Sequence, residues 1–115
     1  MFFFEHGVLR EHVVPKRGET YVHSCTEQVF RAVVGWIDEH LDDRFTLESV
    51  VAAEQLPNSA AAVALRFLHA HGLIERCYPR MNRAAPGEVG SLSESALMCW
   101  HALREGVDPL KLGAV

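Results

Sequence analysis

The segment from Phe45 to Glu75 constrains the fold of this chain more than any other. Apolar residues at helical spacing predict one helix over 47–55 and another over 60–71, with the turn sequence Leu-Pro-Asn-Ser between them. Gly72 follows the second helix and suits a left-handed helix end. Residues 73–78 are rich in strand formers and predict a strand. The sequence therefore predicts two helices joined by a tight turn and followed by a strand.

Two further helices are predicted on either side of this segment. Residues 24–42 open with the capping-box pattern S-x-x-E from Ser24 to Glu27, and residues 91–105 open with the same pattern from Ser91. The first helix has an apolar stripe made of Phe30, Val33, Val34, Ile37 and Leu41. The last helix has a stripe made of Leu92, Ala96, Trp100 and Leu103. Both stripes predict helices that cover a core.

The predicted architecture is a mainly helical α+β domain. Phe2–Phe4 and Val8–Val14 predict one strand or a small hairpin within an N-terminal arm, residues 1–22. The central domain is predicted over 23–86. There, residues 79–83 suit a turn, and residues 84–87 make only a poor returning strand. Residues 87–115 form the C-terminal helix and tail, a candidate for dimerisation.

The composition is that of an ordinary folded domain. With 115 residues, of which 49% are hydrophobic and 23% charged, the chain suits one domain with a modest core. The formal net charge of −4 shows no overall excess of basic residues. Residues 57–86, however, carry a local charge of +3, and residues 27–54 a local charge of −5. Such asymmetry suits a protein that turns one face toward an anion, and a mixed surface would give the same pattern.

The three cysteines favour a reducing, cytoplasmic environment. Their number is odd and their spacing does not repeat, which argues against a disulfide framework. The N-terminal sequence MFFFEHGVLREH has charged residues within its apolar stretch and lacks the pattern of a secretory signal. No apolar run approaches the length of a membrane-spanning helix, so we expect no membrane association.

The central segment resembles a winged helix-turn-helix domain of the kind found in bacterial transcriptional regulators. The resemblance rests on Thr46-Leu47 at the start of the helix over 47–55 and on Leu56-Pro57-Asn58-Ser59 in the turn. It also rests on Leu65-Arg66-Phe67-Leu68 and on His71-Gly72-Leu73-Ile74-Glu75. It covers roughly residues 24–80, and neither the first 22 residues nor the last helix belongs to it.

The resemblance implies a three-helix core with a small β-wing, and binding of double-stranded DNA without a cofactor. The helix over 60–71 would enter the major groove and the wing would lie on the backbone. The predicted DNA-binding residues are Asn58, Ser59 and Arg66 at the groove, and Arg76, Arg80 and Arg83 on the phosphates. The other outward positions on the helix are Ala60, Ala62 and Val63, which can offer only apolar contacts.

Each predicted DNA contact also has a structural interpretation. Asn58 and Ser59 are residue types that commonly cap a helix, and a solvated surface or loop equally suits the arginines. The small apolar run over 60–64 would let another protein approach closely, so a protein-interaction module is the main alternative. Phe2–Phe4 and Trp100 suggest a homodimer formed by the N-terminal strand and the C-terminal helix, or alternatively a core closed within one chain.

Metal binding and catalysis are weaker alternatives. His69 or His71 with Cys77, or Cys99 with His101, are the candidate metal ligands, but none has the spacing of a structural zinc site. Cys25 near His23 suggests a reactive thiolate without a visible third partner. The chain has no recognised catalytic motif, so we expect neither an enzyme nor a metal protein.

Overall fold

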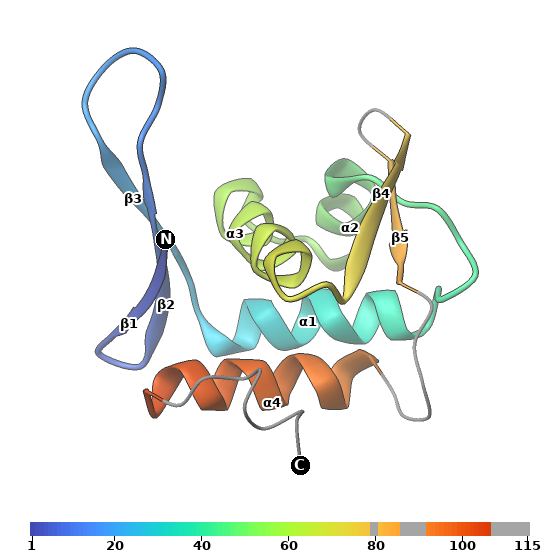
Figure 1. Cartoon of the computed structure of the whole chain (residues 1–115). Coiled ribbons are helices and arrows are strands. Elements are labelled where there is room, and N and C mark those ends of the chain that lie inside the picture. Colours follow the sequence, from blue (N-terminus) through green and yellow to red (C-terminus); the bar gives the residue numbers. More distant parts are fainter. Residues whose placement is uncertain (79–80, 86–91, 107–115) are drawn as a thin grey trace.

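Four helices and two small antiparallel sheets make up the part of the chain that the computed structural model describes, residues 1–78, 81–85 and 92–106 (Figure 1). In chain order the elements are β1 (Phe2–Glu5), β2 (Val8–Val13), β3 (Tyr21–Cys25), α1 (Glu27–Asp38), α2 (Leu47–Glu54), α3 (Asn58–Ala70), β4 (Ile74–Tyr78), β5 (Met81–Ala84) and α4 (Leu92–Arg104). The expected α+β domain is confirmed. None of the helices within those ranges is long and apolar enough to cross a membrane.

Helix α1 lies at the centre of the molecule, with α4 on one side and α2 and α3 on the other (Figure 1). Four members of its predicted stripe are buried, namely Phe30, Val33, Val34 and Ile37. The fifth, Leu41, was predicted wrongly: α1 ends at Asp38, and Leu41 is 44% exposed. The α4 stripe is confirmed, since Ala96 and Trp100 are buried and Leu92 and Leu103 pack against the same core.

The N-terminal arm forms a three-stranded sheet in the order β1-β2-β3, one strand more than a hairpin. His6 and Gly7 join β1 to β2 with φ angles of 53° and 75°, as a two-residue hairpin turn requires. Strand β3 continues to Cys25, past the predicted start of the first helix. Helix α1 is instead capped by Thr26, whose side chain accepts a hydrogen bond from the Val29 amide at 3.3 Å. The predicted cap at Ser24 is therefore wrong.

The aromatic residues of β1 close the core of the monomer. Phe2 meets Phe67 edge to face at 5.4 Å, and Phe4 meets Trp100 edge to face at 4.8 Å. Phe67 and Trp100 are fully buried. The N-terminal sheet thus packs against α3 and α4 of the same chain, and these aromatics no longer favour a dimer.

Helices α2 and α3 follow the sequence prediction closely. Thr46 caps α2 through a reciprocal pair of hydrogen bonds with Ser49. Gln55 adopts a left-handed conformation in the turn, and α3 begins at Asn58, two residues before its predicted start. Gly72 has a φ of 71° just beyond the end of α3, which confirms its predicted role.

The β4–β5 hairpin differs from the prediction in its second strand. Residues 79–83 were expected to form the turn, but β5 already begins at Met81. Strand β5 pairs with β4 from Met81 to Ala84. Phe45, in the link before α2, also bonds to it: its amide donates to the Asn82 carbonyl at 2.8 Å, and the Asn82 amide donates back at 2.7 Å. A segment distant in sequence therefore adds a second backbone partner to β5. Of the poor returning strand predicted at 84–87, Ala84 is the last residue of β5, and residues 86–87 lie outside the described residues.

Candidate nucleic-acid interface

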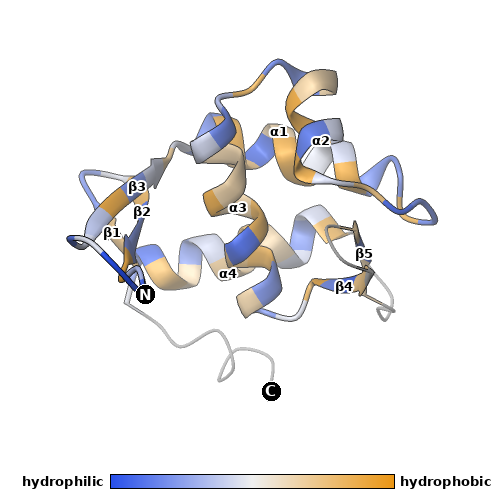
Figure 2. Cartoon of the chain, turned by 90° about the horizontal axis from the view of Figure 1, so that it is seen from above, coloured by the Kyte–Doolittle hydropathy of each residue, from blue (hydrophilic) through white to orange (hydrophobic). Residues whose placement is uncertain are grey.

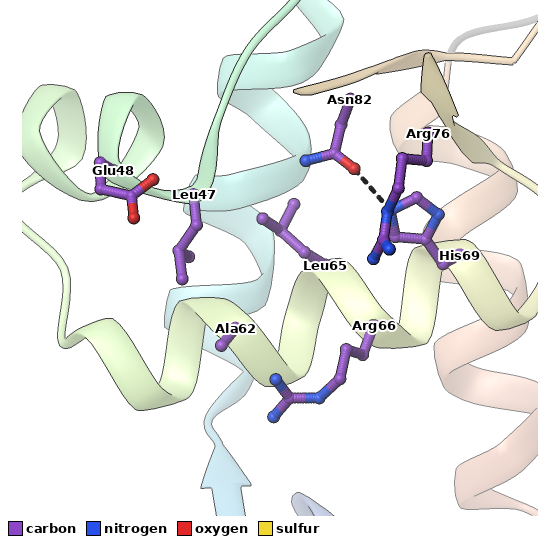
Figure 3. A pocket seen from close by; sticks show the side chains of 8 residues that line it. All are labelled: Leu47, Glu48, Ala62, Leu65, Arg66, His69, Arg76 and Asn82. Carbon is purple, nitrogen blue, oxygen red and sulfur yellow. Dashed lines mark hydrogen bonds between the residues drawn. The ribbon is translucent and has the colours of Figure 1, made fainter. Parts of the chain in front are cut away.

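A hollow of about 260 Å³ lies between the start of α2, the exposed side of α3 and the β4–β5 hairpin (Figure 3). Its lining residues are Leu47, Glu48, Ala62, Leu65, Arg66, His69, Arg76 and Asn82. Among the charged residues, two guanidinium groups stand against a single carboxylate. The lining therefore combines apolar residues with hydrogen-bond donors that could bind an anionic ligand.

Asn82 and His69 connect the hairpin to α3. His69 Nε2 lies 2.6 Å from Asn82 Oδ1, so the imidazole N–H donates to the amide oxygen. Asn82 is almost completely buried, and its backbone is held by Phe45 as described above. These bonds set the position of the hairpin relative to α3, and with it the position of Arg76 on β4.

Arg76 is the most available cation of the hollow. Its side chain is exposed, and within the described residues no carboxylate forms an ion pair with it. Strand β4 carries Arg76 to the same hollow as His69 (Figure 3). The predicted contact of Arg76 with DNA remains a prediction.

Arg66 is already engaged within the protein. Its Nε donates to Glu11 Oε1 of β2 at 2.6 Å, and the Glu11 side chain is only 11% exposed. In Figure 3 the guanidinium turns back toward the N-terminal half of α3. Arg66 was predicted on an outward face at the DNA groove. It is exposed, and the N-terminal sheet brings a carboxylate to it, which the sequence did not indicate.

Arg83 also differs from its predicted setting. It lies in β5, not at a turn, and its Nε donates to Glu75 Oε1 of β4 at 2.6 Å. The two residues face each other in the strand register. Arg80, the third predicted backbone contact, lies outside the described residues.

The first turns of α3 are more enclosed than the sequence suggested. Asn58 and Ser59 are exposed, as predicted, and neither caps the helix, because Pro57 occupies the N-cap position without a side-chain hydrogen bond. Ala60 and Val63 were predicted to face outward but are buried. Strand β3, α1 and α2 all pack against α3. Ala62 alone of the three predicted apolar contacts reaches the surface.

Several residues of this site were missed in the sequence. Glu11, Glu48, His69 and Asn82 join it only because strands and helices distant in the chain pack together. A lone glutamate in a strand or a lone asparagine near a turn carries no local signal for such a role. The periodicity of the second helix did indicate that Ala62 and Arg66 share a face.

Two of the three cysteines do not suit a reactive thiolate, and the described residues hold no cluster of metal ligands. Burial raises the pKa of Cys25 to about 12 and also raises the pKa of Cys99, so both thiols stay protonated at neutral pH. No group of three potential ligands lies close enough to hold a metal ion among the residues described.

Comparison of the chain with protein-family models, with curated proteins and with solved structures finds no match. The arrangement of its own residues must therefore carry any functional conclusion.

Proposed function

We propose that this chain is a winged helix-turn-helix protein that binds double-stranded DNA through the hollow between α3 and the β4–β5 hairpin. One observation carries the proposal: Arg76, which forms no ion pair with any carboxylate of the described residues, lines an exposed hollow with His69 and Asn82, and Glu48 is the one carboxylate among the lining residues. The winged-helix assignment is supported by the order α1, α2, α3 and hairpin, and by the bridge from Phe45 to Asn82 that adds a short third extended segment to the hairpin.

The proposed contact is mainly with the phosphate backbone. The exposed part of α3 offers Asn58, Ser59 and Arg66 as groups able to form hydrogen bonds, and Ala62 and Ala70 as small apolar ones. So few polar groups give little capacity to read base edges in a major groove. The arginine and histidine side chains that line the hollow suit contacts to phosphates. Such contacts position a protein on DNA without reading its sequence. We therefore propose weak sequence preference.

The biological setting follows as part of the same proposal. A small protein of this kind would act in the cytoplasm as a transcriptional regulator or an accessory factor. A homodimer would place two α3 helices about one DNA turn apart. The aromatics that first suggested a dimer lie in the monomer core, so sedimentation of the free protein and of its DNA complex is needed to establish the assembly.

The proposal is tested by titrating a fluorescent duplex of about two helical turns with the protein. Binding should be measurable in about 50 mM salt and fall steeply by about 200 mM. Arg76→Gln should weaken it and reduce the slope of log affinity against log salt by about 0.9, because one phosphate contact is lost. Arg31→Gln on α1 is the matched control, since it removes an exposed arginine that pairs with Glu27 away from the hollow.

The alternative is a protein-interaction module, and one contact favours it. Glu11 already neutralises Arg66, and Leu47, Ala62 and Leu65 give the hollow an apolar lining. If the folded protein fails to bind duplex DNA in about 50 mM salt, the DNA proposal is wrong and this alternative takes its place.

A further inference from the structure

We propose that the β2–β3 hairpin is a second DNA-contacting arm, which holds the phosphate backbone on the side of α3 opposite the β4–β5 hairpin. This inference rests on the proposed function and adds a contact surface that no motif in the sequence indicated. The arm consists of the ends of β2 and β3 and the residues 14–20 that join them.

The position of the arm is the first argument. Both hairpins rise on the same side of α1, and α2 and α3 lie between them (Figure 1). Seen from above, α3 again lies between the N-terminal sheet and the β4–β5 hairpin (Figure 2). A duplex that lies across the exposed side of α3 and reaches Arg76 would therefore meet the β2–β3 arm on its other side.

The charge of the arm is the second argument. Lys16 and Arg17 are exposed at its end, and Glu19 is the only acidic residue of the connecting segment. Neither cation forms an ion pair with any residue in the described ranges. Two adjacent cations without an internal partner, carried on an arm that extends from the core, are suited to contact phosphates.

The face of the arm that turns toward α3 is the third argument. In the strand register Tyr21 pairs with Val13 and His23 pairs with Glu11, so Tyr21 and His23 lie on the face that carries Glu11 to Arg66. Tyr21 is 44% exposed, and its ring meets that of His23 edge to face at 4.8 Å. A phenol and an imidazole on this face add donors for phosphate between the basic end of the arm and α3.

The test is the salt dependence of duplex binding by the full chain. Lys16→Gln combined with Arg17→Gln should lower the slope of log affinity against log salt by about 1.8 and weaken binding at least about tenfold in about 50 mM salt. Arg17→Gln alone should remove about half of that slope. The charge-matched control is Arg31→Gln combined with Arg104→Gln, which removes two exposed arginines beside Glu27 on the α1–α4 side.

The outcomes separate this inference from the proposed function. If the wild-type protein binds no duplex, both fall together. If it binds and Arg76→Gln weakens binding, while the arm variant has the same slope as the charge-matched control, only the arm proposal is overturned. An arm variant that leaves the slope unchanged but alters the sedimentation of the free protein would assign the arm to a second copy of this chain, which also overturns the proposal. Circular dichroism and thermal midpoints equal to those of the wild type establish that each variant is folded.

Discussion

Arg66 of α3 and Glu11 of β2 stand 55 positions apart in the chain, and they form a hydrogen-bonded ion pair of 2.6 Å between helix and sheet. Glu11 is nearly buried, whereas Arg66 is 45% exposed at the edge of the hollow. The pair therefore does two things: it fixes the sheet on α3, and it withholds one cation from any ligand of the hollow.

Neutralising Glu11 should separate these two effects. We expect Glu11→Gln to increase DNA affinity several-fold in about 50 mM salt, because Arg66 becomes free to contact a phosphate. The free energy of unfolding should fall by about 1 kcal/mol, a modest loss because Arg66 is partly solvated. Duplex titration and urea denaturation measure the two quantities. Glu5→Gln on the same sheet, which pairs with Arg10 at 3.4 Å, is the control, and equal affinities of the two variants would contradict the expectation.

The two neighbours Ala62 and Val63 should respond in opposite ways to an arginine. Ala62 lines the hollow, so we expect Ala62→Arg to change stability by no more than about 0.5 kcal/mol and to raise the salt slope of DNA binding by about 1. Val63 is fully buried, so Val63→Arg should cost at least about 4 kcal/mol and prevent folding. Thermal melts followed by duplex titration distinguish them. A folded Val63→Arg protein would contradict the burial of Val63 and mean that this side of α3 faces solvent.

Trp100 should be the most sensitive position of the core. It is fully buried against Phe4 and Phe30, so Trp100→Ala should cost about 3–5 kcal/mol. Trp100→Phe should cost much less, because no acceptor within the described residues reaches the indole Nε1 and its loss removes an unpaired buried donor. Denaturant unfolding measured by circular dichroism gives both values. Equal losses for the two variants would mean that the indole N–H has a partner.

Cys25 should make the protein less stable in alkali. Burial raises the pKa of its thiol from an ordinary value of 9.0 to about 12. Between these values the unfolded chain loses a proton that the folded chain keeps, so the free energy of unfolding should fall by up to about 1.4 kcal/mol for each pH unit. Below pH 9 this contribution vanishes. Cys25→Ala should show a shallower alkaline decline than the wild type, and parallel curves for the two proteins would refute the assignment.

The helices could be predicted because their signals are local. The stripe from Phe30 to Ile37, the cap at Thr46 and the stop at Gly72 all depend on residues within a few turns of one another. The extent of the sheets could not be predicted in the same way. Strand β5 pairs with β4 and also bonds through Asn82 to Phe45, and this second pairing depends on segments brought together by the folded chain.

The sequence by itself determined that α3 is a short, alanine-rich helix with Arg66 on its more polar side, because side-chain spacing along a helix is a local property. Only the tertiary structure decided which side of that helix is open. Small apolar residues occur around much of α3, so several of its sides can pack against other elements. The N-terminal sheet packs against one of them. The tertiary structure also decided the ion-pair partners of Arg66 and Arg83, because an ion pair between residues apart in the chain depends on the packing and register of whole elements.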